Sequence, residues 1–326
     1  MSHAGPHADA SARPSTGDGP DGAPGSEPES TTWRDVVAAY VGLTKPRVIE
    51  LLLLTTVPVM FFAERGIPAL GLVAATVVGG ALSAGSASAY NCVYDRDIDE
   101  QMRRTRRRAL PRHMVSPLSA LVFATVLAVL STVVLALWVN WLSAGLSVLA
   151  NAFYVFVYTM LLKRRTTQNI VWGGLAGCFP ALIGWTAVTC QLAWTPVVLF
   201  LVVFFWTPPH TWALALRYRE DYRNVDVPML PVVKPAAEVG RQVVLYSWVM
   251  VATSLLLWPV AGTSLVYPAA AAVLGGVFLV EAHRMWSRAK DSDVLSEINP
   301  MRLFHASNLY LSLLFVAVAL DPLLVR

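Results

Sequence analysis

Three oxygen-bearing side chains follow one another at four-residue intervals where an apolar stretch of the sequence ends. Asn91, Asp95 and Asp99 lie in the segment NCVYDRDIDEQMRRTRRR (91–108). At about 100° per residue, a helix would bring all three onto one face, with Asp97 roughly opposite. Such hard oxygen ligands suit Mg²⁺, which keeps several waters. The spacing is equally typical of a solvated helix end whose aspartates pair with arginines, so both interpretations stay open.

A second acidic group follows another long apolar stretch. The segment FFWTPPHTWALALRYREDYRNVDVPMLP (204–231) contains Glu220, Asp221 and Asp226 near its end. Two acidic groups facing one another across a bundle would bind divalent cations, which reverse the sign of the local field and so attract a diphosphate. Nearby arginines and lysines would hold the remaining phosphate oxygens. A diphosphate beside an apolar cavity fits the ionisation of an allylic diphosphate, because metals stabilise the leaving group and exclusion of water protects the carbocation.

The elements that must position these side chains are membrane-spanning helices. Of the 326 residues, 56% are hydrophobic and 14% are charged, whereas soluble domains carry about 25% charged residues. The three cysteines show no spacing pattern of a disulfide framework or a zinc ribbon. We therefore expect an all-α integral membrane protein with about nine transmembrane helices. The nine candidate spans are 46–63, 67–92, 116–138, 140–162, 169–190, 193–214, 241–262, 266–285 and 302–322.

Basic residues are distributed unequally between the connections that join these spans. Segments 93–115, 163–168, 215–240 and 286–301 hold most of them, whereas the opposite connections hold almost nothing basic beyond Arg65. By the positive-inside rule, the basic side is cytoplasmic, and with it the N-terminus and both acidic groups. The net charge of +4 then reflects membrane topology and does not indicate a nucleic-acid partner.

The first 32 residues differ in composition from all that follows. Residues 1–32 consist largely of Pro, Gly, Ser, Ala and Asp, which predicts a disordered tail that lacks the apolar core of a signal peptide. Residues 33–326 are expected to form a single transmembrane domain. The segment WRDVVAAYVG (33–42) is typical of a short helix at the membrane interface.

Five features of the sequence resemble the UbiA-type intramembrane prenyltransferases. Asn91, Asp95 and Asp99 match the NxxxDxxxD signature of that family, and four ordered blocks are similar to the branch that transfers a farnesyl group to haem b. The blocks are LTKPRVIELLLLTT (43–56), MRRTRRRALP (102–111), YTMLLKRRTTQNIVWGGLAGCFPALIGW (158–185) and TPPHTWALALRYREDYRNVDVPMLPVV (207–233). The resemblance runs from about residue 40 to the C-terminus.

The resemblance implies a reaction and assigns residues to it. Farnesyl diphosphate, bound through Mg²⁺, would donate its farnesyl group to a vinyl group of haem b, and water would then be captured to give haem O. Carried over position by position, Asn91, Asp95 and Asp99 would bind one metal, Asp221 would bind the other, and the three aspartates would be catalytic. The implied diphosphate contacts are Arg104, Arg108, Lys163, Arg164 and His210. The implied location is the bacterial cytoplasmic membrane, with the lipid bilayer as surroundings and the site on the cytoplasmic side.

Two positions depart from the family pattern. The family commonly reads RPLP where this chain has Ala109, and it reads DYxxAGxPMLP where this chain has Asp226 in place of the glycine. Asp226 is then either an additional metal ligand or a polar loop residue. Other activities also stay open: a UbiA-type enzyme with an aromatic acceptor such as 4-hydroxybenzoate, or a cation transporter lined by carboxylates. The resemblance also leaves open whether a haem A synthase or an oxidase docks on the chain.

The composition of the tail leads to a prediction. Removing residues 1–32 is expected to leave prenyl transfer intact, because this polar segment contributes no residue to the predicted site. Turnover of the shortened and full-length chains in the same membranes measures this. A lost reaction, with equal amounts of protein in the membrane, would show that the tail is more than a passive extension.

Overall fold

The structure, a computed structural model, describes residues 32–324. These residues form helices joined by short loops, and no strand occurs between 32 and 324. Nine helical segments in this part of the chain are long and apolar enough to cross a membrane. The prediction of an all-α bundle of about nine transmembrane helices is therefore confirmed. The predicted tail lies outside the described residues except for Thr32, which caps the first helix.

The helices that span the bundle begin and end close to the predicted limits. They are α2 (Pro46–Glu64), α3 (Leu70–Tyr94), α5 (Pro117–Trp138), α6 with η1 (Trp141–Ala152, Phe153–Leu162), α7 with η2 and α8 (Asn169–Gly173, Gly174–Cys178, Phe179–Thr189), α9 (Trp194–Arg217), α12 (Ala236–Ala261), α13 (Val266–Asp291) and α14 with α15 (Leu295–Ile298, Pro300–Leu324). The short helices are α1 (Trp33–Thr44), α4 (Arg96–Gln101), α10 (Arg219–Arg223) and α11 (Leu230–Val233).

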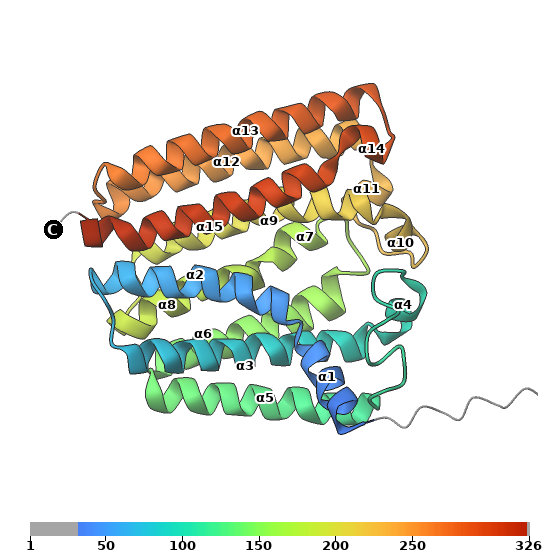
Figure 1. Ribbon diagram of the computed structural model, residues 1–326, viewed down its shortest axis with the longest axis horizontal. Helices are drawn as coiled ribbons and strands as arrows, with labels where there is room; N and C mark the ends of the chain where they lie inside the picture. The colour runs from blue at the N-terminus through green and yellow to red at the C-terminus, as the bar shows by residue number, and fades with distance from the viewer. Residues whose placement is uncertain (1–31, 325–326) are drawn as a thin grey trace, which may run out of the picture.

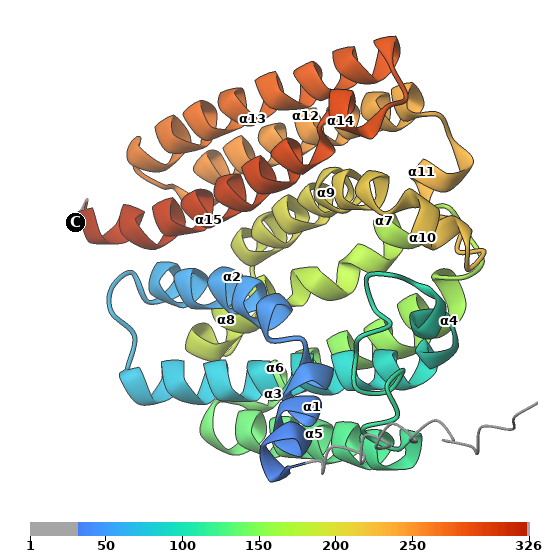
Figure 2. The same ribbon diagram turned by 45° about the vertical axis from the view of Figure 1, so that its right-hand side comes forward.

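The short helices gather at one end of the bundle. Figure 1 shows α1, α4, α10, α11 and α14 at that end, and the C-terminus at the other. One group of helices consists of α9, α12, α13 and α15, and another of α3, α5 and α6, with α2 and α8 packed between them (Figure 2). The end with the short helices carries the basic connections, so it is the end for which a cytoplasmic position is predicted.

A left-handed residue turns the chain between α1 and α2. Lys45 has a φ of 53° and precedes Pro46, the first residue of α2. Proline is favourable at this position because the first turn of a helix has no use for its missing N–H. The turn allows the side chain of Lys45 to face the interior of the bundle, where it contacts α3.

The second half of the fourth span is a π-helix, η1. The amide of Lys163 donates to the carbonyl of Tyr158 at 2.9 Å, and the Thr159 hydroxyl donates to the carbonyl of Tyr154 at 2.9 Å. Both bonds reach back five residues, so residues five apart lie on one face of η1. In an α-helix, Tyr158 and Lys163 would point roughly 140° apart. The π-helical winding therefore brings Tyr158 and Lys163 to the same side.

Two glycines allow close contact between elements that surround the interior. A Cβ atom on Gly184 in α8 would lie 2.4 Å from the carbonyl oxygen of Thr56 in α2. A Cβ atom on Gly173 in α7 would lie 2.1 Å from the ring of Tyr158. Any larger residue would push these elements apart, so Gly173 helps to fix the position of the Tyr158 ring.

A buried carboxylate at the opposite end of the bundle joins α15 to the start of α13. Asp321 accepts hydrogen bonds from the amides of Ser264 at 3.0 Å and Tyr267 at 3.2 Å, and from the Ser264 hydroxyl at 2.6 Å. The residue that precedes α13, Leu265, has no capping side chain. Asp321 therefore caps α13 from a different helix.

This cap predicts a loss of stability far from the acidic helix end. We expect Asp321→Ala to lower the free energy of unfolding by about 1–3 kcal/mol, because buried donors lose their acceptor. Thermal unfolding in detergent measures the change. Asp321→Asn keeps an acceptor oxygen and should lose less, so equal losses in the two variants would contradict the capping role.

Candidate functional site

A cavity of about 360 Å³ combines a charged mouth with apolar walls. Its volume lies in the range of about 300–1,000 Å³ that is usual for ligand sites. The walls include Leu52, Leu53 and Ile183 from α2 and α8. The charged residues and tyrosines of the lining, together with Asn91, come from seven elements and loops: Lys45, Asn91, Asp99, Arg104, Arg108, Tyr154, Tyr158, Lys163 and Tyr222. Five of the nine residues predicted for the site thus line one cavity.

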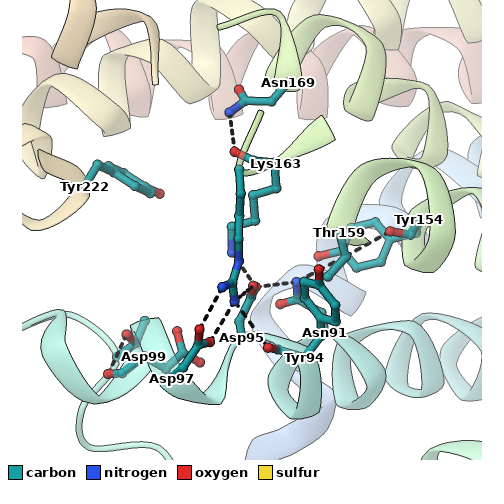
Figure 3. Close-up of polar contacts among 12 residues, drawn as sticks. Asn91, Tyr94, Asp95, Asp97, Asp99, Tyr154, Thr159, Lys163, Asn169 and Tyr222 are labelled. Carbon is teal, nitrogen blue, oxygen red and sulfur yellow. Dashed lines mark hydrogen bonds and ion pairs between the residues drawn. The ribbon is translucent and has the colours of Figure 1, made fainter. Parts of the chain in front are cut away.

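Asp95 is the centre of a hydrogen-bond network directly below this mouth. It is 0% exposed, and its carboxylate accepts from Asn91 Nδ2 at 2.7 Å and from the Lys163 ammonium. Figure 3 shows Asn91, on α3, and Lys163, in the turn after η1, approaching Asp95. Burial opposes the charged form of Lys163, but the Asp95 carboxylate raises the pKa of Lys163 above its usual value. Each charge therefore stabilises the other in a place where neither would be stable alone.

Asp99 lies one turn further on and has a partner of its own. It is 2% exposed, and its Oδ2 accepts from Arg108 Nη1 at 2.6 Å. Its amide donates to the carbonyl of Asp95 at 2.9 Å, so the helical path from Asn91 continues through the junction of α3 and α4. The predicted column of Asn91, Asp95 and Asp99 is present and buried, so these residues are not a solvated helix end. The pairing of its aspartates with arginines, which the alternative interpretation predicted, is nevertheless observed.

Lys45 is a residue of the mouth that the sequence analysis missed. Its Nζ donates to Asn91 Oδ1 at 2.7 Å. Burial lowers the pKa of Lys45 to about 8. The signal in the sequence was a lysine directly before the proline that begins a span, but the spacing gives no hint of its contact with α3.

Asp97 and Arg164 form an outward-facing pair. Asp97 is 57% exposed and binds both terminal nitrogens of Arg164 at 2.7 Å. Arg164 also approaches Asp95 at 3.4 Å and lies 5.0 Å over the ring of Tyr94. The predicted opposite direction of Asp97 is thus observed. Arg164, predicted to contact diphosphate, lies outside the cavity lining and supports the network from the rim.

Of the second acidic group, only Asp221 points inward. It is buried, and its Oδ2 accepts from the backbone amide of Arg104 at 3.1 Å. The side chain of Arg104 donates to the Tyr222 hydroxyl at 3.1 Å and lies 5.4 Å over the ring of Tyr218. These contacts join the loop after α4 to α10. Asp221 does not line the cavity itself, but it binds the backbone of Arg104, which does.

The other two members of that group do not point toward the cavity, and of the two interpretations of Asp226 the polar loop residue is the one that the structure favours. Glu220 is exposed and pairs with Arg223 at 2.8 Å, because it lies on the outer face of α10. Asp226 is exposed and has a φ of 52°. This left-handed conformation favours glycine and tolerates aspartate, which explains the glycine of the family pattern at this position. The exposed side chain of Asp226 belongs to a turn and does not join the buried carboxylates.

His210 also lies apart from the cavity, contrary to the prediction that it contacts diphosphate. Its ring stacks between Trp206 at 4.1 Å and Phe304 at 4.5 Å, and its Nδ1 bonds Ser307 Oγ at 2.8 Å. It is absent from the residues that line the cavity. The physical reason is that α9 turns this face toward α15, where the histidine is a packed and hydrogen-bonded residue.

The donor atoms of the site fit a Mg²⁺ ion that binds together with substrate better than a metal ion that is held by protein ligands alone. Within residues 32–324, no three His, Cys, Asp or Glu side chains converge closely enough to hold a metal. Mg²⁺ is commonly bound by one or two carboxylates together with substrate phosphates and waters. Asp95, Asp99 and the Asn91 amide offer hard oxygens of this kind beside the cavity. The site is therefore suited to a metal that arrives with an anionic substrate.

Comparisons with known proteins show the family of the chain. The UbiA prenyltransferase family matches residues 52–308. "Protoheme IX farnesyltransferase" from Nocardioides sp. is 82% identical over 296 residues, covering 91% of this chain and 94% of that relative. The relative of the same name from Cutibacterium acnes is 60% identical over 291 residues, covering 89% of this chain and 86% of its own.

Among solved structures, digeranylgeranylglyceryl phosphate synthase has a TM-score of 0.72 at 13% identity, covering 89% of this chain and all 100% of the other. A UbiA homolog from Archaeoglobus fulgidus, bound to DMAPP and Mg²⁺, has a TM-score of 0.63 at 15% identity, covering 86% and 99% of the two chains. These likenesses show the fold. The chain therefore belongs to the UbiA prenyltransferase family as a multi-pass integral membrane protein, in the group of the protoheme IX farnesyltransferases.

Proposed function

We propose that the chain transfers the farnesyl group of farnesyl diphosphate to a vinyl group of haem b and so forms haem O. One observation carries the proposal: buried oxygens of Asn91, Asp95 and Asp99 meet cationic side chains at the mouth of an apolar cavity. A charged mouth fits the diphosphate, and apolar walls fit an isoprenoid chain. The name of the relatives at 82% and 60% identity supports the same donor and acceptor.

The oxygen ligands would bind Mg²⁺, and the cationic side chains would bind the phosphate oxygens. Asn91, Asp95 and Asp99 would hold one Mg²⁺ ion and Asp221 a second. When bound, Mg²⁺ supplies charge stabilisation for the departing diphosphate. Arg108 and Lys163 pair with the carboxylates of Asp99 and Asp95, and Lys45 donates a hydrogen bond to the neutral Asn91 oxygen. Arg104 lines the same cavity. The same cations would contact phosphate oxygens, arginine in forked fashion and lysine as a point charge.

The reaction balances with water as the only further reactant. The bond between C1 of farnesyl and the diphosphate oxygen breaks, and its electron pair leaves with the diphosphate. The π electrons of the vinyl group form the new carbon–carbon bond to C1, which leaves a cation beside the porphyrin. Water adds to that cation and loses a proton. The rings of Tyr154 and Tyr158 line the cavity and would stabilise the first cation through their faces.

The basic end of the bundle is proposed to face the cytoplasm. Arg104, Arg108 and Lys163 lie in connections at this end, and the positive-inside rule places such connections in the cytoplasm. In a bacterium, the site would then open at the cytoplasmic membrane to a water-soluble diphosphate head and to lipid-soluble tails.

The proposal is tested with membranes that contain the full chain. Incubation with haem b, farnesyl diphosphate and Mg²⁺ should yield haem O, identified by mass, and chelation of Mg²⁺ should abolish the product. Membranes without the chain serve as the control. Prenylation of 4-hydroxybenzoate in place of haem would show that the acceptor is wrong while the donor chemistry is right.

A further inference from the structure

The cavity of the predicted site extends along one face of α3, away from its charged mouth at Asn91. The residues of α3 that line it below Asn91 are small and recur every three or four positions: Thr76, Gly80, Ser83, Ala84, Ala87 and Ser88. Residues with this spacing share one face of a helix. The wall that faces them includes Leu53 of α2. Depth in the cavity can therefore be counted in residues of α3, starting from Asn91.

The deep end of the cavity is closed by buried side chains. The lining residues that lie farthest from the mouth along their helices are Thr56 of α2, Thr76 of α3 and Ile183 of α8, and all three are buried. We call them the floor of the cavity. One turn beyond Ile183, Thr186 Oγ1 and Ser143 Oγ share a hydrogen bond of 2.8 Å that joins α8 to α6. A chain that enters from the mouth therefore meets the floor, and the depth of the floor limits the length of that chain.

The depth of the cavity matches a chain of three isoprene units. Farnesyl has twelve carbons in line, which span about 14 Å when extended at about 1.5 Å per bond with ordinary bond angles. Gly80 and Thr76 lie eleven and fifteen residues from Asn91 along α3, about 16 Å and about 22 Å by helical rise. With the diphosphate at Asn91 and C1 beside Ser88, the third isoprene unit lies beside Gly80, and the chain ends above Thr76.

Gly80 faces the cavity, whereas the glycine before it packs α3 against α5. A Cβ atom on Gly79 would lie 2.6 Å from the side chain of Leu135, so no room remains there. A Cβ atom on Gly80 would meet only Leu53 Cδ2, at 4.0 Å, and both residues line the cavity. This distance is an ordinary contact, so alanine fits at position 80, but a longer side chain would fill the space that the third isoprene unit needs.

We propose that Gly80 selects the length of the isoprenoid donor, because the absence of a side chain there leaves room for a third isoprene unit above the floor. The inference rests on the proposed function, which places a farnesyl chain in this cavity. Gly80 lies about 16 Å from Asn91 by helical rise, so it contacts the end of the chain and not the reacting carbon. A change at this position therefore alters which donor fits and leaves the groups at the mouth in place.

A series of side-chain sizes at position 80 tests the proposal. Gly80→Ala should keep the preference of the wild type for farnesyl diphosphate. Gly80→Leu should lower kcat/KM for farnesyl relative to geranyl diphosphate by about 100-fold, because the third isoprene unit loses its space. Leucine is also a better helix former than glycine, so α3 stays intact. Gly145→Leu is the matched control, at an exposed glycine of α6 with no atom near its Cβ position, and should leave the preference unchanged.

Two measurements separate the role of Gly80 from the identity of the acceptor. The full chain in lipid nanodiscs is assayed with haem b, Mg²⁺ and each diphosphate in turn, and the products are identified by mass. Calorimetry with each diphosphate and Mg²⁺ measures donor binding without an acceptor. If no haem O forms but Gly80→Leu shifts donor binding from farnesyl to geranyl diphosphate, the acceptor is wrong and the role of Gly80 stands.

The other outcomes overturn the role of Gly80. An unchanged preference in Gly80→Leu, with haem O still formed by the wild type, would mean that the isoprenoid does not extend along this face of α3. Equal losses with farnesyl and geranyl diphosphate would mean that leucine disturbs the whole site. If the wild type binds neither diphosphate, the proposed function fails and the inference fails with it.

A substitution in the floor should change the preference in the opposite direction. Ile183→Ala leaves a space below the end of the farnesyl chain and should raise kcat/KM for geranylgeranyl relative to farnesyl diphosphate by about 10-fold. Ile170→Ala makes the same change at a buried isoleucine that does not line the cavity, and should leave this ratio unchanged. An unchanged ratio in Ile183→Ala would show that the floor does not limit the length of the donor.

Discussion

Replacing Asp99 with asparagine should lower turnover by about 10²–10³-fold while the bundle stays folded. Loss of a group that stabilises developing charge in a transition state typically has an effect of this size. Asparagine keeps an oxygen that accepts from Arg108, which now bonds Asp99 Oδ2 at 2.6 Å. The variant therefore removes the charge that would bind Mg²⁺ while leaving the shape of the mouth nearly unchanged. Turnover is measured with haem b and farnesyl diphosphate over a series of Mg²⁺ concentrations.

The same loss is expected for Asp95→Asn, and a third aspartate provides the control. Asp97 lies between the two in the sequence but is 57% exposed and pairs with Arg164. Asp97→Asn makes the same chemical change on the outer face of α4 and should retain most of the activity, because exposed ion pairs contribute only about 0–1 kcal/mol. The Mg²⁺ concentration for half-maximal turnover should rise in the Asp95 and Asp99 variants and stay unchanged for Asp97→Asn.

Comparing the three aspartate variants distinguishes metal binding by the column from a general effect of negative charge near the cavity. Each of the three variants removes one carboxylate, so they differ only in whether that carboxylate is buried in the column or exposed. If the column binds Mg²⁺, only the two buried positions should affect turnover. Normal turnover in Asp95→Asn and Asp99→Asn would contradict the metal role. Equal losses in all three variants would instead indicate a nonspecific effect of net charge at the mouth.

The spans were predictable because a bilayer leaves few alternatives. A helix that crosses it needs about 20 apolar residues, so hydropathy marks its position well. The ends were less certain where a helix continues past the apolar part. Helix α13 runs to Asp291, six residues beyond the predicted limit, through the charged turn that contains Arg288 and Lys290. Composition marks where lipid ends, whereas local hydrogen bonding decides where a helix ends.

Parts of the site followed from helical periodicity, and parts did not. The column of Asn91, Asp95 and Asp99 was predictable, since the helical path passes through the junction of α3 and α4 with its hydrogen bonds kept. The contact of Lys45 with Asn91 depends on a left-handed residue between two helices, which no period describes. The common face of Tyr158 and Lys163 arises from the π-helical winding of η1, which a period of 3.6 residues places wrongly.

His210 shows that a sequence motif alone does not predict which neighbours a side chain packs against. A polar residue in a buried helix satisfies its hydrogen bonds wherever partners exist, and both faces of α9 near His210 adjoin other helices. The sequence PPHTW gives no information on which face adjoins the cavity. In the structure, Ser307 of α15 supplies the partner at 2.8 Å, and the aromatic rings on both sides complete the packing.

Replacing Asp221 with asparagine is the second change expected to have a large effect. We expect turnover to fall by about 10²-fold or more, because Asp221 is the only buried carboxylate of its group within the described residues. Its Oδ2 also accepts from the Arg104 amide at 3.1 Å, so two roles must be separated. Asparagine retains an acceptor for that amide but loses the charge. Glu220→Gln, next to it and exposed, is the matched control and should keep most of the activity.

The dependence on Mg²⁺ distinguishes a second metal from a loop anchor. If Asp221 binds metal, Asp221→Asn should need more Mg²⁺ for half-maximal turnover, while its thermal unfolding stays close to that of the wild type. If Asp221 only anchors the loop through Arg104, Asp221→Asn should retain turnover, and Asp221→Ala should lose it together with stability, because the buried amide then has no acceptor. The first result supports a second metal that Asp221 would hold; the second leaves one metal, which the column on α3 and α4 would hold.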